Sequence, residues 1–169
     1  IAAAAFGVAD RARDKGVADA AGRTHQVVTA VEHSAVRFSA ERAGSVTVVP
    51  VAGHGRVDAD EVLAAITPET AAVHVQWANH EVGTIQPLAH AHEACRAAEV
   101  PLVVDACAAL GWLPPPSAWD VLVGSAHKWG GPAGVGVMVI RPGVRWRSPF
   151  PTDEAGRWAG FPDVPAAVS

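Results

Sequence analysis

Short apolar runs alternate along the chain with stretches in which apolar residues recur at helical spacing. The runs predict strands at 26–29, 45–51, 72–77, 101–105, 121–124 and 135–140. Helices are predicted at 34–41, from a cap at Asp58 to about residue 67, and at 87–99. In the second helix, Val62, Leu63 and Ile66 form the expected apolar stripe. Strands separated by helices predict an α/β fold with a mostly parallel sheet flanked by helices.

Composition and charge exclude several classes of protein. Half of the 169 residues are apolar and 18% are charged, which suits one globular domain. The net charge of −4 opposes binding to nucleic acid. No run of eighteen uncharged apolar residues predicts a membrane span, and no signal peptide is visible. Cys95 and Cys107 are too few for a disulfide framework, which indicates a cytoplasmic protein.

Polar or ionisable residues directly follow four of the predicted strands. They are Glu32-His33, Asn79-His80-Glu81, Asp105, and the run from Ser125 to Lys128. In open α/β sheets, ligands bind beyond the carboxyl ends of the strands. We therefore expect the functional site where these four strand ends meet.

Lysine occurs only as Lys15 and Lys128, and only Lys128 follows a predicted strand. A lysine at that place either extends to solvent or serves as a Schiff-base amine. Asp105 likewise has two interpretations. It forms a turn after its strand, or it pairs with a protonated ring nitrogen or a metal.

Three other sites are not supported by the pattern. The helix at 87–99 carries four potential metal ligands, His90, His92, Glu93 and Cys95. Only residues three or four positions apart share a helix face, which leaves His92 with Cys95 as one possible pair, and two ligands do not make a zinc site. The Ser125-x-x-Lys128 spacing of acyl-serine enzymes requires a later Lys-Thr-Gly, which this chain lacks. The glycines at 130–136 precede a strand, so they do not form a dinucleotide loop.

Several segments resemble the cysteine desulfurases, which are class V, fold type I pyridoxal-phosphate enzymes. They are Thr-Ala-Val-Glu-His-Ser-Ala-Val at 29–36, Ala-Asn-His-Glu-Val-Gly-Thr-Ile-Gln-Pro at 78–87, Val-Asp-Ala at 104–106, and Ser-Ala-His-Lys-Trp-Gly-Gly-Pro-Ala-Gly-Val-Gly at 125–136. The resemblance implies the aspartate aminotransferase-like architecture. It further implies that residues 1–169 are part of the large cofactor-binding domain, with an N-terminal segment and a small C-terminal domain outside this chain.

The resemblance also assigns catalytic roles. Lys128 would hold pyridoxal 5′-phosphate as a Schiff base and then move the Cα proton of the substrate. Asp105 would pair with the ring nitrogen and keep it protonated, so that the ring accepts electrons. His33 would stack on the ring.

The remaining cofactor contacts follow from the same resemblance. Ser125 and His127 would bind the phosphate, while Asn79 and His80 stand where the family has two asparagines. Three positions depart from the family pattern, namely His80, Ala108 and Phe161. No metal is implied.

The activity implied is removal of sulfur from L-cysteine, giving alanine and an enzyme-bound persulfide. A homodimer, a sulfur acceptor protein and a place in iron–sulfur cluster assembly follow from the resemblance. The alternatives are another class V enzyme, such as an aminotransferase or a β-lyase, and a cofactor-free binding or dimerisation module. Because neither Cys95 nor Cys107 stands where the family has its nucleophile, we expect the isolated chain to be inactive.

Overall fold

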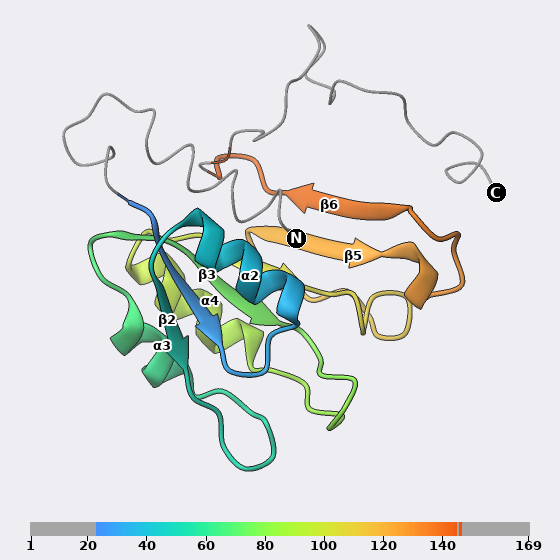
Figure 1. Ribbon diagram of the computed structural model, residues 1–169, viewed down its shortest axis with the longest axis horizontal. Coiled ribbons are helices and arrows are strands. Elements are labelled where there is room, and N and C mark those ends of the chain that lie inside the picture. The colour runs from blue at the N-terminus through green and yellow to red at the C-terminus, as the bar shows by residue number, and fades with distance from the viewer. Residues whose placement is uncertain (1–22, 145, 147–169) are drawn as a thin grey trace, which may run out of the picture.

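The computed structural model describes residues 23–144 and 146 of the chain (Figure 1). In this part, six strands form one sheet with the order β2-β1-β3-β4-β5-β6. They are β1 (His25–Thr29), β2 (Val46–Val49), β3 (Thr70–Gln76), β4 (Leu102–Asp105), β5 (Val121–Ser125) and β6 (Gly136–Ile140). The first five are parallel, and β6 runs antiparallel to β5. The predicted α/β class with a mostly parallel sheet is confirmed.

Three α-helices and one short 3₁₀ helix connect the strands. They are α2 (Ser34–Ala43), α3 (Ala59–Ala65), α4 (Leu88–Ala97) and η1 (Ala126–Lys128). Asp58 caps α3 as predicted, because its Oδ1 accepts from the backbone N–H of Asp60 at 3.0 Å. The predicted stripe of α3 is only partly right, since Val62 is buried while Leu63 is 46% exposed. Lys15 and Phe161 lie outside the described residues.

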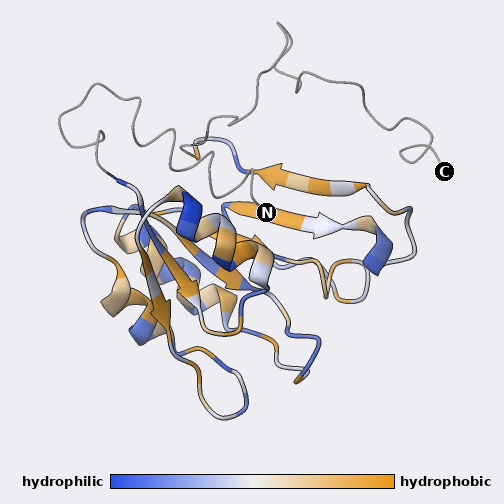
Figure 2. Cartoon of the chain, in the orientation of Figure 1, coloured by the Kyte–Doolittle hydropathy of each residue, from blue (hydrophilic) through white to orange (hydrophobic). Residues whose placement is uncertain are grey.

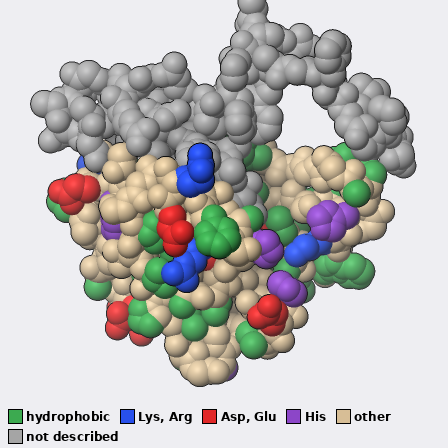
Figure 3. Space-filling model, in the orientation of Figure 1, with side chains coloured by type: hydrophobic (Ala, Val, Ile, Leu, Met, Phe, Trp, Pro, Cys, Tyr) green, Lys and Arg blue, Asp and Glu red, His purple; other side chains and the backbone are tan. Residues whose placement is uncertain are grey.

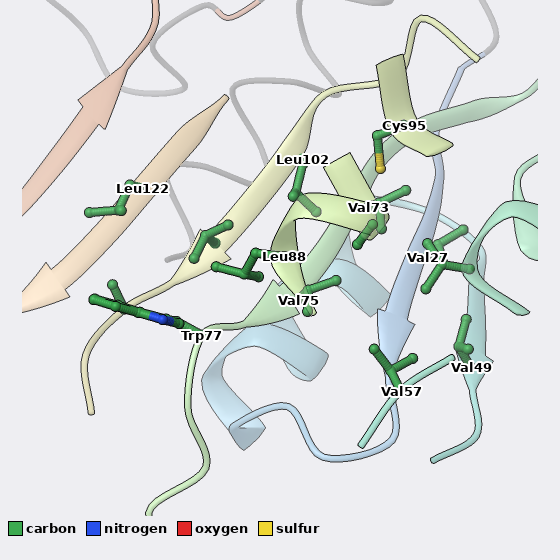
Figure 4. Close-up of a cluster of buried hydrophobic side chains, with 14 of the residues drawn as sticks. Val27, Val49, Val57, Val73, Val75, Trp77, Leu88, Cys95, Leu102 and Leu122 are labelled. Carbon is green, nitrogen blue, oxygen red and sulfur yellow. The ribbon is translucent and has the colours of Figure 1, made fainter. Parts of the chain in front are cut away.

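The largest core lies between the sheet and the helices α3 and α4 (Figure 4). Alternate residues of the central strands, among them Val27, Val73 and Leu102, point into it. From α4, Leu88 and Cys95 meet them, and both are almost fully buried. Because parallel strands with helices on both faces bury both sets of side chains, the strands are mostly apolar, as Figure 2 shows.

The other face of the sheet is covered over β1 by α2, so that α2 and α4 lie on opposite sides (Figure 1). This face includes a buried polar pair, in which His74 Nε2 lies 2.9 Å from Gln26 Oε1. Burial lowers the pKa of His74 to about 4, so the ring is neutral at physiological pH. A smaller cluster of buried apolar side chains lies over β4 to β6 and includes Val103, Val121 and Val123.

Acidic and basic side chains are scattered over the face of the molecule shown in Figure 3. None of the helices in the described residues combines the length and apolar character needed to cross a membrane.

Candidate functional site

The four strand ends singled out in the sequence lie side by side in the sheet. Strands β1, β3, β4 and β5 are consecutive neighbours and all parallel, so their carboxyl ends meet at one edge. The register places Gln76 of β3 level with Asp105 of β4, and Asp105 level with Val123 of β5. The fold therefore brings the residues that follow these strands to one place.

Asp105 is the last residue of β4 and is 9% exposed. Its Oδ1 accepts a hydrogen bond from the backbone N–H of Cys107 at 2.9 Å, which closes a tight turn after the strand. The turn-forming interpretation of Asp105 is thus correct. It does not exclude the second interpretation, because a carboxylate has two oxygens and several acceptor positions.

Lys128 ends the 3₁₀ helix η1, which directly follows β5, and its side chain is half-buried. Before it, Ser125 Oγ lies 3.0 Å from His127 Nδ1. The indole N–H of Trp112 donates to the backbone carbonyl of Lys128 at 2.8 Å. The Trp112 indole thus holds the turn that carries the lysine, and Ser125 and His127 place two polar groups directly before Lys128 in the chain.

Two glycines allow the lysine turn to approach the sheet closely. A Cβ on Gly124 would lie 2.7 Å from Leu110 Cδ2 and 2.9 Å from Trp129 Cζ3. A Cβ on Gly111 would lie 2.6 Å from Trp129 Cβ, and the φ of Gly111 is +86°. Trp129, the residue after Lys128, therefore packs into a space that only these glycines leave open.

His33 is exposed and caps the N-terminus of α2, because its Nδ1 accepts from the backbone N–H of Ala35 at 3.1 Å. This bond leaves Nε2 to carry the proton of the neutral ring. The helix cap therefore fixes the orientation of the imidazole at the end of β1.

Asn79 is buried and shapes its own turn after β3. Its Oδ1 accepts from the backbone N–H groups of Glu81 at 2.8 Å and Val82 at 3.0 Å. Its Nδ2 donates to the carbonyl of Val31 at 3.5 Å. The side chain of Asn79 is thus occupied by protein contacts, whereas His80 beside it is exposed.

Glu32 follows β1, and its sequence position alone gave it no role. Its Oε1 accepts from the Thr29 hydroxyl at 2.6 Å and from the backbone N–H of Gln76 at 2.7 Å. Burial of the carboxyl raises its pKa to about 7, and the charge of Asp105 adds to this effect. The signal in the sequence was its position directly before His33.

Neither cysteine has the properties of a nucleophile. Cys95 is fully buried in the core. Burial raises the pKa of both thiols to about 12. For Cys107, the neighbouring Asp105 adds to this effect, so the thiolate is disfavoured beside the site.

No group of three or more histidine, cysteine, aspartate or glutamate side chains among residues 23–144 and 146 is arranged to hold a metal. Of the candidates on α4, Cys95 points into the core, whereas His92 Nε2 lies 3.2 Å from Asp120 Oδ2, outside hydrogen-bond geometry. A groove of about 700 Å³ runs between residues 52–60, α3 and α4. It contains none of the predicted site residues.

Comparisons with known proteins agree with this architecture. The aminotransferase class-V family matches residues 12–152. A cysteine desulfurase of Trichormus azollae is 36% identical over 155 residues, which cover 86% of this chain and 39% of that protein. A putative cysteine desulfurase NifS of Bacillus subtilis (strain 168) is 35% identical over 152 residues, covering 85% of this chain and 38% of that protein.

Solved structures give the same result. A NifS-like protein superposes with a TM-score of 0.80 at 28% identity, covering 98% of this chain and 49% of the other. DndA from Streptomyces lividans gives a TM-score of 0.73 at 27% identity, covering 97% of this chain and 51% of the other. This chain thus spans about half or less of the length of these proteins, and by the match to residues 12–152 it belongs to the aminotransferase class-V family.

Proposed function

We propose that this chain carries the pyridoxal 5′-phosphate site of a cysteine desulfurase, which removes sulfur from L-cysteine to give alanine and an enzyme-bound persulfide. The observation that carries the proposal is that His33, Asp105 and Lys128 stand at one edge of the sheet, at the carboxyl ends of the parallel strands β1, β4 and β5. The similarity to cysteine desulfurases over most of the chain supports it.

The residues at this edge fit the chemistry of the cofactor. An amine is needed for the aldehyde, a carboxylate for the ring nitrogen and hydrogen-bond donors for the phosphate. Lys128, Asp105, and the pair Ser125 and His127 supply these groups in that order. When bound, pyridoxal phosphate supplies an electron sink for the pair of electrons left when a substrate bond breaks.

The chain's own residues then have defined tasks. The amine of Lys128 holds the cofactor and afterwards accepts the Cα proton of the substrate. Asp105 keeps the ring nitrogen protonated, and its turn-closing bond to Cys107 holds the carboxylate in place. His33, oriented by its cap on α2, provides a flat ring at the end of β1.

Asn79 and His80 are proposed to border the same site from β3. Because the amide of Asn79 is engaged by Glu81, Val82 and Val31, its contribution is to set the shape of the turn. His80 is the more accessible of the two and would contact the cofactor.

The proposed partners follow from the function. They are L-cysteine or a related amino acid, a second copy of the chain in a homodimer, and a protein that accepts sulfur in iron–sulfur cluster assembly. A cytoplasmic location is proposed with them, since the two thiols are free.

The test is to add pyridoxal phosphate to the purified chain, reduce with borohydride and map the modified peptide. The expected result is a visible absorbance that appears on addition of the cofactor, with the label on Lys128. Lys128→Ala should abolish both signals, whereas Lys15→Ala should change neither. Label on Lys15, or on no lysine, would contradict the proposal and favour a cofactor-free binding or dimerisation module.

His80 and Ala108 depart from the cysteine desulfurase pattern. For this reason a second candidate function is that of an aminotransferase or β-lyase of the same family. Product analysis distinguishes the two in a form of the protein that turns over. Alanine with persulfide indicates a desulfurase, whereas a keto acid or free sulfide with pyruvate indicates the alternative.

A further inference from the structure

The turn between β1 and α2 is fastened to β3 by a group of polar contacts. Glu32 Oε1 receives the Thr29 hydroxyl and the Gln76 backbone N–H at 2.6 and 2.7 Å. In addition, the Gln76 side-chain amide and the Asn79 amide donate to the carbonyl of Val31. These contacts join the end of β1 to the end of β3 at the edge where the predicted site lies.

The same turn leads directly into His33, which follows Glu32 and caps α2. Any shift of Glu32 relative to β3 would therefore move the imidazole. The other end of Glu32 faces the interior, because its Oε2 is buried and has no hydrogen-bond partner among the described residues.

An ionised carboxyl in this position would be unfavourable for two reasons. One oxygen is buried without a donor, and the charge of Asp105 on β4 is close enough to oppose a second negative charge. A proton on Oε2 removes the cost of burying a charge and the repulsion by Asp105, and it leaves Oε1 free to accept its two bonds. The pKa of about 7 agrees with this geometry.

We propose that Glu32 is a positioning residue of the cofactor site, whose neutral carboxyl fastens the turn carrying His33 to β3 and leaves Asp105 as the negative charge at this edge. The inference rests on the proposed function for its link to the cofactor. The attachment of the turn between β1 and α2 to β3 depends only on the contacts of Glu32 within this chain.

The first experiment measures thermal unfolding of the chain without cofactor between about pH 6.5 and 8.5. The folded-state pKa of Glu32 lies above the ordinary value, so the stability that its neutral form gives is present at low pH and is lost as the pH rises through about 7. His25 and His74 have lowered pKa values and titrate below this window, and both thiols titrate above it.

The expected result is that the midpoint of the wild-type chain falls by about two degrees across this window. Glu32→Gln, which is neutral and keeps the Oε1 acceptor, should remove that fall. Glu81→Gln, which changes an exposed carboxyl on the neighbouring turn, should behave as wild type. Equal pH dependence in Glu32→Gln and wild type would overturn the proposal.

The second experiment measures binding of pyridoxal phosphate by absorbance at neutral pH. Glu32→Gln should bind as wild type, while Thr29→Val, which removes one donor to Glu32, should bind about fivefold more weakly. A Glu32→Gln protein that loses binding would show that the ionised carboxyl is needed and would overturn the proposal. If wild type itself does not bind, the proposed function fails, and the unfolding experiment still decides the role of Glu32.

Discussion

The indole of Trp112 donates a hydrogen bond to the backbone carbonyl of Lys128 at 2.8 Å, although 71% of the Trp112 side chain is exposed. The two residues are sixteen positions apart and belong to the connections on either side of β5. The bond restricts the 3₁₀ turn from which the lysine amine extends. It is therefore expected to matter more for the reaction of Lys128 than for the stability of the fold.

Trp112→Phe keeps an aromatic ring and removes the donor. A net value of about 1 kcal/mol for one hydrogen bond corresponds to about fivefold slower formation of the bond between Lys128 and pyridoxal phosphate. The rate is measured by the rise in absorbance after mixing. Trp119→Phe is a matched control, since Trp119 donates to the carbonyl of Pro116 at 2.9 Å, away from Lys128. Equal slowing in both variants would contradict a role for Trp112 in positioning the lysine.

Asp105→Asn is expected to leave the fold intact and to remove the chemistry. The asparagine Oδ1 still accepts from the Cys107 N–H, but a neutral amide does not keep a ring nitrogen protonated. With cofactor added, exchange of the Cα proton of L-alanine in D₂O, followed by NMR, should slow by roughly a hundredfold or more. Asp120→Asn serves as the control, because Asp120 Oδ2 accepts from the backbone N–H of Leu102 at 2.8 Å, at the opposite end of β4 from Asp105. Undiminished exchange in Asp105→Asn would show that the carboxylate does not serve the ring.

Both thiols should react slowly with a disulfide reagent at pH 8 in the folded chain. Their pKa values of about 12 leave little thiolate, and Cys95 is also inaccessible. Unfolding in guanidinium should speed the reaction at least about tenfold, with Cys107 the faster of the two in the folded state. For the same reason, the 169-residue chain with cofactor and L-cysteine should form no alanine. Alanine formation that Cys107→Ala abolishes would identify that thiol as the nucleophile and disprove this expectation.

The buried pair of His74 and Gln26 predicts loss of stability in acid. The folded-state pKa of His74, about 4, lies below the ordinary value of 6.5. The stability from its neutral form is therefore present above pH 6.5 and is lost as the pH falls toward 4, by on the order of 2–3 kcal/mol. Urea unfolding at several pH values measures the loss. His74→Gln should reduce this loss of stability in acid. His90→Gln, on the exposed side of α4, should leave the loss unchanged. The same loss in the wild type and in both variants would rule out His74 as its source.

Local patterns determined the strands and helices of this protein to within a few residues. Apolar runs are sufficient for β3, β4 and β5 because these strands are buried on both faces. The differences lie at the ends. The strand expected up to Val51 stops at Val49, since Pro50 cannot donate to a ladder, and Val51 pairs instead with Val57 in an isolated bridge.

The sequence by itself also determined which residues stand after the strands, because the order of residues along each connection is fixed by the chain. What the tertiary structure decided is that β1, β3, β4 and β5 are consecutive neighbours, which makes Lys128, Asp105 and His33 parts of one edge. The contacts of Glu32 with Gln76 and of Trp112 with Lys128 join residues 44 and 16 positions apart. Such contacts depend on strand pairing and on which side chains lose their water, and neither is encoded in the periodicity of a single segment.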